Sequence, residues 1–599
     1  MILQSLADYY ARSKDLAAAG WEWKRIPYVI ELKRDGTFVQ LTSLKTGKKA
    51  TQVTPSLVPK AEIRSGTRAY EHPNAMWDHI GFLLDHPKGD ARSDQETATK
   101  QFLAFQQRVV DLSDRRPESV GLTAVRRFYE RHEYQRVSSD PLWQECSKLA
   151  GCNMTFRLAD ETDLIVQESA VQSLFSESSQ DKGEAAGLCL VSGETGPIQQ
   201  LHFPISGVCE KPAPLAAIND GSNPAFASFG KHQGFNFPVG QRAVFQYTTA
   251  LNHLLRPGSR QRMQVGDAST VFWAQRADDA DMEAWFSEIF TEADDPDART
   301  EQIRALFEAI RSGRFDGARG SERFFVLGLA PNAARISVRF WHVAPLASIA
   351  QRTRAWFDDL QITRGPNDPE FPTLFRLLLA AAVLNKADNI PPNLGGDVMR
   401  SALGGTPLPT SLLQATVQRC RADQAKKTDT GKPVAHVSYH RAAILKACLN
   451  RLIKNHRLPG KEIAVSLDTK NTDPAYLLGR LFAAYERIQS DAAGRDLNRT
   501  VRDTYFGAAM SNPAAVFPRL IQLNQHHMRD LRRSSPGLHV VRDRLIGEIW
   551  DGLRGDAALP AQQPLAERAR YALGYYHQRQ AFFNKAPAET TTTHTQGGA

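Results

Sequence analysis

The sequence predicts an α+β protein: a mixed α/β N-terminal region with β-hairpins over residues 1–370, followed by an all-helical region over 371–584. Three observations support this division. Apolar and polar residues alternate in several N-terminal stretches, apolar residues recur at helical spacing in the last third, and 599 residues exceed what one hydrophobic core usually organises. The tail 585–599 has low complexity, and we expect it to be disordered.

The N-terminal region begins with a predicted short helix over 3–10 and continues with strands. Residues 28–44 alternate around an Asp-Gly pair that is typical of tight hairpin turns. A second hairpin is predicted over 324–341, where two β-rich runs flank a turn-forming Pro-Asn pair. These patterns predict sheets joined by loops, in which binding residues are commonly carried.

From about Pro372 the apolar residues follow helical spacing throughout. Asp473 and Pro474 are residue types that favour the start of a helix, and the apolar stripe after them predicts a helix over 474–489. Short connections between such helices predict a bundle over 473–584. The further helices predicted in this bundle cover 500–510, 516–533, 541–553 and 565–583.

The net charge of +9 is concentrated near the N-terminus, where residues 1–70 contain 12 Lys or Arg and six Asp or Glu. A basic segment gains affinity for phosphates through counterion release, so it indicates a polyanionic partner such as nucleic acid. A solvated basic surface without a partner is the alternative that charge alone leaves open.

Several classes of protein are excluded or disfavoured. The longest apolar helical run, 377–384, is far shorter than the roughly 20 residues of a membrane span, and no signal peptide is present, so we expect a cytoplasmic protein. The six cysteines form no CxxC pair, and the signatures of phosphate loops, dinucleotide folds, HExxH proteases and GxSxG hydrolases are absent. We expect no metal, no cofactor and no catalytic centre.

The stretch "NPAFASFGKHQGFNFPVG", 223–240, follows neither a strand nor a helix period. It combines aromatic side chains with amides, a lysine and glycines. It contains four phenylalanines, namely Phe226, Phe229, Phe235 and Phe237. This composition raises the question of what the aromatic residues support and what the polar ones contact.

The stretch 223–255 resembles the signature of the large subunit of the type I-C CRISPR Cascade effector, a Csd-type family. In that signature, a run of the form SFN-x-x-AF-x-SYG-x-x-Q-x-x-NAPVS leads into a helix reading ALN-x-LL. Other similar blocks occur in order along the chain at 1–10, 326–341, 476–489 and 573–583. Phe229 stands where the family commonly has tyrosine and Phe237 where it commonly has a small residue.

The resemblance implies a non-catalytic subunit of an RNA-guided surveillance complex. Such a subunit recognises a protospacer-adjacent motif in duplex DNA, promotes unwinding and R-loop formation, and supports recruitment of a separate helicase-nuclease, while base pairing reads the target. The implied partners are the guide CRISPR RNA, target double-stranded DNA, the backbone and RNA-handle-binding subunits, and small subunits that resemble the bundle 473–584.

Under this resemblance, carboxamides are expected to read the motif bases because they donate and accept hydrogen bonds at once; they are Gln233, Asn74 and Asn236. Gly230 and Gly234 are expected to let the backbone approach DNA closely. Basic side chains are expected to contact the DNA backbone, namely Lys231, Arg64, Arg68, Lys60, Lys48 and Lys49. Arginines of the bundle are expected to line a strand groove, namely Arg480, Arg487, Arg529, Arg532 and Arg533.

Two other functions remain as alternatives. A metal-dependent nuclease would use clustered acids as ligands, for which Asp294, Asp295 and Asp297 are the candidates. A generic single-stranded nucleic-acid-binding protein would bind without any dependence on a flanking duplex motif.

Overall fold

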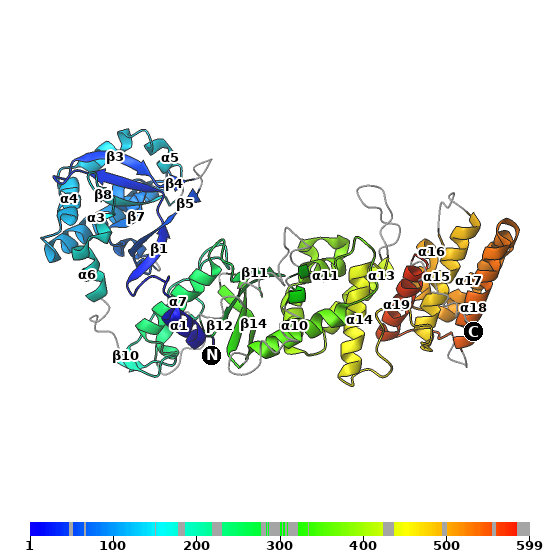
Figure 1. The fold of residues 1–599 in the computed structure, drawn as a ribbon. Coiled ribbons are helices and arrows are strands. Elements are labelled where there is room, and N and C mark those ends of the chain that lie inside the picture. Colours follow the sequence, from blue (N-terminus) through cyan, green and yellow to red (C-terminus); the bar gives the residue numbers. More distant parts are fainter. Residues whose placement is uncertain are drawn as a thin grey trace, which may run out of the picture. The chain divides into compact units, whose positions relative to one another are not determined.

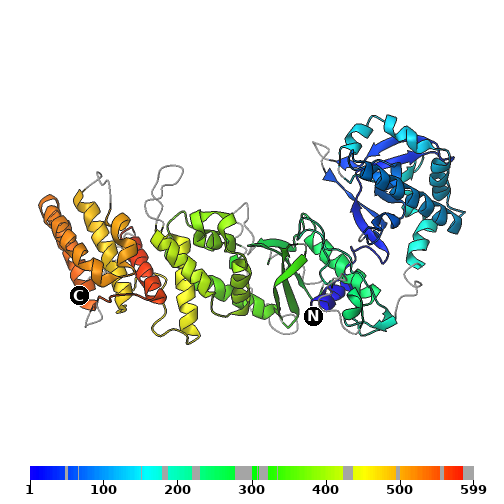
Figure 2. The same ribbon diagram turned by 180° about the vertical axis from the view of Figure 1, so that it is seen from behind.

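The computed structural model describes most of the chain. The described residues are 1–46, 52–64, 67–149, 151–177, 186–218, 230–276, 321–333, 335–422, 436–493, 500–553 and 559–583, with a few more between 283 and 308. The predicted disorder of the tail 585–599 falls outside them. By their contacts, the residues divide into two compact units, each drawn in Figures 1 and 2. Unit 1 comprises Met1–Ser206 and Pro212–His253, and unit 2 comprises Gly207–Lys211 and Leu254–Ala599.

Unit 1 is built around a four-stranded sheet in the order β3-β2-β8-β7. Its strands are β2 (Tyr28–Leu32), β3 (Phe38–Ser43), β7 (Trp77–His79) and β8 (Asn153–Leu158). The pairing of β2 with β8 is parallel and the other two pairings are antiparallel. Every residue of β2 is buried. A strand in this central position has both faces covered, which explains why its sequence is mostly apolar.

The predicted hairpin at 28–44 is confirmed by the pairing of β2 with β3. Its turn places Gly36 at a φ of +88°, in the left-handed region that favours glycine. A Cβ atom here would also lie 2.6 Å from Cβ of Arg127 on α4 (Val120–Glu130). The glycine therefore permits both the turn and the close approach of the helix.

The core of this sheet also contains residues of several helices, namely α4, α2 (Ile80–Leu84), α3 (Arg92–Arg115), α5 (Trp143–Ser147) and α6 (Ser169–Glu177). Unit 1 further contains α1 (Ile2–Arg12) and most of α7 (Gln241–Leu255), which contribute no residue to this core. Three short antiparallel pairs join β1 (Trp21–Arg25) with β6 (Pro55–Pro59), β4 (Lys45–Thr46) with β5 (Gln52–Val53), and β9 (Ala186–Leu188) with β10 (Thr195–Pro197). The rings of Tyr10 on α1 and Phe245 on α7 meet edge to face with centroids 5.7 Å apart, which joins these two helices.

Unit 2 begins with an antiparallel sheet in the order β11-β12-β13-β14. The strands are β11 (Arg262–Val265), β12 (Ala268–Ala274), β13 (Arg323–Asn332) and β14 (Arg335–Pro345). The pairing of β13 with β14 confirms the predicted hairpin at 324–341. Its turn lies at Ala333, slightly later than expected, because Pro331 and Asn332 still pair with Ile336 and Arg335.

Helices follow the sheet to the end of the described chain, which confirms the predicted change to an all-helical region. They are α10 (Leu346–Leu360), α11 (Leu374–Ala381), α12 (Leu394–Gly404), α13 (Thr410–Ala422), α14 (Tyr439–Lys454), α15 (Pro474–Ala493), α16 (Val501–Ala509), α17 (Pro513–Ser534), α18 (Pro536–Gly552) and α19 (Leu565–Ala581). The predicted cap of α15 is present, since Oδ1 of Asp473 accepts a hydrogen bond from the Tyr476 N–H at 3.0 Å.

One hydrophobic core runs from the sheet of unit 2 into the bundle. It includes Phe340 of β14, Leu445 of α14, Phe482 of α15 and Tyr571 of α19, each at most 3% exposed. The predicted boundary near residue 371 therefore falls inside unit 2, where sheet and helices bury their apolar faces together. Among the described residues, no helix has both the length and the apolar composition of a membrane span.

The helices α15 and α19 cross at a backbone-to-backbone contact made by two glycines. A Cβ atom on Gly479 would lie 2.0 Å from the Tyr571 carbonyl oxygen, and one on Gly574 would lie 2.0 Å from the Tyr476 carbonyl oxygen. A distance this short is a clash, and a helix backbone has little freedom to relieve it. The bundle therefore depends on glycine at both positions.

We expect Gly574→Ala to destabilise the protein by about 1–3 kcal/mol or more, because the added methyl group separates α15 from α19. Denaturant or thermal unfolding followed by circular dichroism measures this. The matched control is Gly547→Ala on α18, where a Cβ atom meets nothing within 4 Å. It should leave stability unchanged or raise it by about 1 kcal/mol through helix propensity. Equal effects of the two substitutions would show that the crossing is not tight.

Candidate nucleic-acid interface

The segment between β6 and β7 is organised around the carboxylate of Asp78, which is 1% exposed. Both terminal nitrogens of Arg64 donate to it, with Nη1 to Oδ1 at 3.0 Å. The backbone N–H groups of Asn74 and His79 donate to the same carboxylate at 2.9 Å each. Arg64 also donates from Nε to the His72 carbonyl at 2.7 Å. A buried charge with this many partners fixes the conformation of the segment.

Asn74, one of the expected base-reading residues, is 3% exposed and belongs to this network. Its Oδ1 accepts a hydrogen bond from the Glu62 N–H at 2.9 Å. Asn74 thus ties the beginning of the segment to Asp78 at its end. In this conformation the carboxamide positions the segment and does not face solvent.

Basic residues of the same region that were expected to contact phosphates interact in part with side chains of the protein itself. Nζ of Lys60 lies 3.3 Å from Oε2 of Glu22, and it stands 4.9 Å from the ring centroid of Phe203 and 5.6 Å from that of Phe245. Because Phe245 is on α7, Lys60 brings the first basic segment beside the helix that follows the glycine-rich stretch. Arg68 is exposed and pairs with Glu71 at 2.7 Å. Lys48 and Lys49 lie outside the described residues.

The glycine-rich stretch is described from Gly230 onward, and it contains the short 3-10 helix η4 (Gln233–Asn236). A Cβ atom on Gly234 would lie 2.5 Å from the carbonyl oxygens of Gln199 and Gln200. The Gly234 N–H also donates to the Gln200 carbonyl at 3.0 Å. Gly234 is therefore needed for an approach of two protein backbones, whereas Gly230, at a φ of +67°, stays exposed with open space around it.

Three polar side chains of this stretch differ in their contacts, since one closes its turn and two have no partner among the described residues. Nδ2 of Asn236 donates to the carbonyls of Lys231 and Gln233 at 3.1 Å each, so Asn236 closes the turn. Gln233 is half-buried and has a φ of +44°. Within the described part of the chain, its carboxamide and the exposed ammonium of Lys231 have no hydrogen-bond or ion-pair partner.

A buried histidine lies beneath the stretch. Nδ1 of His202 is 2.7 Å from the hydroxyl of Tyr247 on α7, and its ring meets that of Phe237 edge to face at 5.2 Å. His202 is 5% exposed, and burial lowers the pKa of its imidazole to about 4. The neutral ring thus joins the glycine-rich stretch to α7 at neutral pH.

The sequence reasoning missed an exposed aromatic residue, Trp23, on β1. Its exposed fraction is 54%. Lys24 follows it with Nζ 5.1 Å from the ring centroid of Trp77, and Arg25 is exposed. Alternation alone does not reveal it, because Trp21 and Trp23 lie two residues apart on the same face of β1, and yet Trp21 is buried and Trp23 is exposed. An exposed tryptophan beside cations suits stacking on a base.

The five arginines expected to line a groove of the bundle lie in different environments. Arg480 is 3% exposed, and its Nε donates to Oε1 of Gln578 at 3.1 Å between α15 and α19. Arg487 pairs with Asp491 at 2.9 Å. The other three are exposed on α17, and none has a carboxylate partner among the residues that the structure describes; they are Arg529, Arg532 and Arg533.

One row of exposed side chains on α17 is basic or amide, and the exposed Asp530 lies beside it. The row has alternating spacings of three and four residues, which keeps its members on one side of a helix. Its members are Arg519, Gln522, His526, Arg529 and Arg533, all exposed. This surface suits a polyanion better than the buried Arg480 does.

The described residues contain no group of three or more His, Cys, Asp or Glu side chains that could hold a metal ion. All six cysteines are described and are free thiols. The acidic candidates for a nuclease site, Asp294, Asp295 and Asp297, lie outside the described residues.

The chain is a CRISPR-associated protein. The model of the family described as CRISPR-associated protein (Cas_Csd1) matches residues 6–583, which is nearly the whole chain, so the chain belongs to this family. The match confirms the resemblance to the Csd-type large subunit of Cascade, and it includes both units. No curated protein matches the chain.

We expect acid to loosen the glycine-rich stretch. The folded state holds His202 at a pKa of about 4, whereas an unfolded histidine has a pKa near 6.5. The unfolded state therefore binds a proton first, and stability decreases as pH falls from about 6.5 towards 4. Hydrogen exchange of peptides from 230–247 at several pH values measures this. His202→Gln keeps a partner for Tyr247 without a titrating ring, so it should flatten the pH dependence; an unchanged dependence would contradict this role.

Proposed function

We propose that this protein is the non-catalytic large subunit of a type I-C CRISPR RNA-guided surveillance complex in the cytoplasm. It recognises the protospacer-adjacent motif in duplex DNA, promotes unwinding and R-loop formation, and supports recruitment of a separate helicase-nuclease. The observation that carries the proposal is the family match over residues 6–583, because it includes both the sheet-based unit and the helical bundle. In such complexes the guide RNA reads the target, and protein reads only the short flanking motif.

The residue that reads the motif is Gln233. Its carboxamide is free to donate and accept, as a base edge requires. The backbone that carries it is held by the hydrogen bond from Gly234 to Gln200 and by the turn that Asn236 closes. A fixed backbone keeps the reading group in place before DNA arrives, which lowers the entropy lost on binding. Lys231, two residues earlier, supplies a phosphate contact.

Other polar residues of unit 1 hold its backbone in place through hydrogen bonds within the protein; they are Asn74, Asn236 and Arg64. Asp78 and Arg64 fix the segment that ends in β7, and Lys60 connects the beginning of that segment to α7. The exposed side of the same unit then offers cations to the DNA backbone. They are Lys231, Arg68 and Arg242 among the described residues, with Lys60, Lys48 and Lys49 proposed from the sequence.

Trp23 gives the same unit a means of holding an opened base pair. A large apolar side chain beside an unpaired base offsets part of the cost of unstacking, which is a few kcal/mol for each step. The neighbouring Lys24 and Arg25 place positive charge beside it. Recognition and opening of the duplex would then both occur on unit 1.

The exposed face of α17 would hold the displaced strand or the backbone of the heteroduplex. Its arginines have no carboxylate partner among the described residues, so no internal ion pair must break when phosphates bind. The guide RNA, the backbone subunits and small subunits similar to the bundle are the further partners that this function requires.

The first test uses the protein assembled with its co-encoded partners and guide RNA. Binding of short duplexes is measured at fixed salt while only the base pairs flanking the target change. We expect the wild type to discriminate by about 1–3 kcal/mol for each changed pair, and Gln233→Ala to flatten this preference. The matched control is Gln135→Ala, which removes an exposed carboxamide elsewhere in unit 1. Discrimination that survives Gln233→Ala would show that another residue reads the motif.

The second test concerns α17. We replace Arg529, Arg532 and Arg533 together by alanine. The plot of log affinity against log salt has a negative slope, and this slope should become shallower by about 2 if each arginine contacts one phosphate of a single strand. Motif preference should not change. A control with the same loss of charge replaces arginines that already pair with carboxylates, namely Arg34, Arg92 and Arg126. A salt slope equal to that of the control would remove α17 from the interface.

A further inference from the structure

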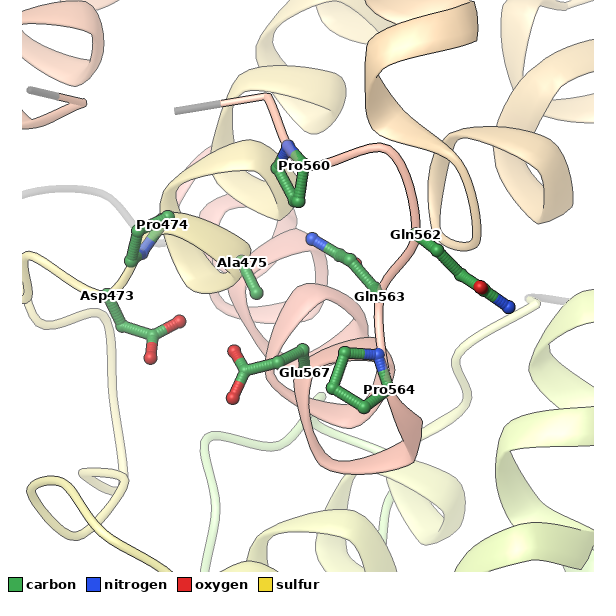
Figure 3. A pocket seen from close by; sticks show the side chains of 8 residues that line it. All are labelled: Asp473, Pro474, Ala475, Pro560, Gln562, Gln563, Pro564 and Glu567. Atoms are coloured by element: carbon green, nitrogen blue, oxygen red, sulfur yellow. The ribbon is translucent and has the colours of Figure 1, made fainter. Parts of the chain in front are cut away.

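A small pocket lies between the first turns of α15 and α19, as Figure 3 shows. Its volume is about 300 Å³, near the lower end of the range for sites that bind small ligands. The lining residues are Asp473, Pro474, Ala475, Pro560, Gln562, Gln563, Pro564 and Glu567. All belong to unit 2, so the pocket is a property of that unit alone.

The side chain of Gln563 points into this pocket (Figure 3) and is unusual in its burial. The residue is 1% exposed, yet neither Nε2 nor Oε1 of its carboxamide has a hydrogen-bond partner. Its backbone is fully engaged, since its N–H donates to the Ser511 carbonyl at 2.9 Å and its carbonyl accepts from Nε of Arg568 at 2.8 Å. A buried amide without partners costs about 1–3 kcal/mol of stability. Such a group is expected where a ligand completes the hydrogen bonds.

The lining itself contains two carboxylates and no cationic side chain, while Arg568 and Arg570 lie beside it. Nη1 of Arg570 lies 2.5 Å from Oδ2 of Asp473 and 3.3 Å from Oε1 of Glu567. One guanidinium therefore serves two carboxylates. Asp473 also uses Oδ1 to cap α15, whereas Oε2 of Glu567 has no partner in the part of the chain that the structure describes. Burial raises the pKa of Glu567, so a second cation beside it would be favourable.

The remaining walls are formed largely by Pro474, Pro560 and Pro564, which have no backbone N–H to donate. They offer apolar surface without competing for hydrogen bonds. A ligand that matches these walls has an apolar stem, a cationic end for Glu567, and a neighbouring group that both accepts from and donates to the Gln563 carboxamide. A peptide group is such a donor and acceptor, and lysine and arginine have apolar stems with cationic ends.

We propose that this pocket binds an arginine or lysine side chain from an extended segment of a partner protein, with the adjoining peptide group hydrogen-bonded to Gln563. Charge complementarity selects this partner, because Asp473 and Glu567 share the one guanidinium of Arg570 and Oε2 of Glu567 has no partner among the described residues. Nucleic acid would place phosphates beside Asp473 and Glu567, and that repulsion opposes binding. The proposal does not require the motif-reading role of Gln233.

The probe is N-acetyl-L-arginine amide, which carries a guanidinium group, one peptide group and one primary amide. Binding to the full-length protein is measured by saturation-transfer difference NMR. We expect it to bind at least fivefold more tightly than N-acetyl-L-citrulline amide, which has the same shape without the charge. It should also bind more tightly than spermidine, which has charge without peptide groups. Equal binding of spermidine would overturn the assignment to a protein segment, and equal binding of the citrulline compound would overturn the role of charge.

Variants locate the probe. Gln563→Leu and Glu567→Gln should each weaken binding of the arginine probe at least fivefold. The matched control Glu548→Gln, which removes an exposed carboxylate on α18, should leave it unchanged.

Gln563→Leu should also keep or raise the melting temperature, because it removes a buried amide that has no partner. A marked fall in melting temperature would show that the amide already has a partner, such as a bound water, and would overturn the proposal. Unchanged binding by Glu567→Gln would do the same.

Discussion

The buried carboxylate of Asp78 is the interaction on which the proposed interface of unit 1 depends. A charge that is 1% exposed must be compensated inside the protein. Arg64 and the N–H groups of Asn74 and His79 provide this compensation, and Arg64 in turn fixes the His72 carbonyl. One ion thereby joins Arg64, which follows β6, to the residues that precede and form β7.

The same requirement separates polar residues whose groups remain free, which the proposed function uses to read DNA, from polar residues that already hold the fold together. Asn74, Asn236 and Arg480 have the right chemistry for nucleic acid, but folding already uses their polar groups. Gln233 and Lys231 keep theirs free among the described residues. A rigid scaffold with few free groups suits specific recognition, since little ordering remains to be done when DNA binds.

Sequence patterns predicted the elements well because periodicity reports which face of an element is buried. The hairpins at 28–44 and 324–341 and the helix beginning at Pro474 all follow from local alternation, turn residues and capping. The fate of single polar side chains did not follow, because it depends on partners distant in sequence. Arg480 meets Gln578, and Gly234 meets the carbonyls of Gln199 and Gln200. The exposure of Trp23 did not follow from alternation either, because Trp23 shares a face of β1 with the buried Trp21.

Gln563 shows the opposite case, in which the requirement for a partner is not met within the chain. Its backbone is satisfied and its carboxamide is not, although the side chain could have been apolar at the same volume. Such a residue lowers the stability of the bundle without improving its packing. The simplest physical account is that the missing hydrogen bonds form in an assembly, so that the bundle is most stable when a partner occupies the pocket. Assembly and folding of this region would then be thermodynamically coupled through one amide.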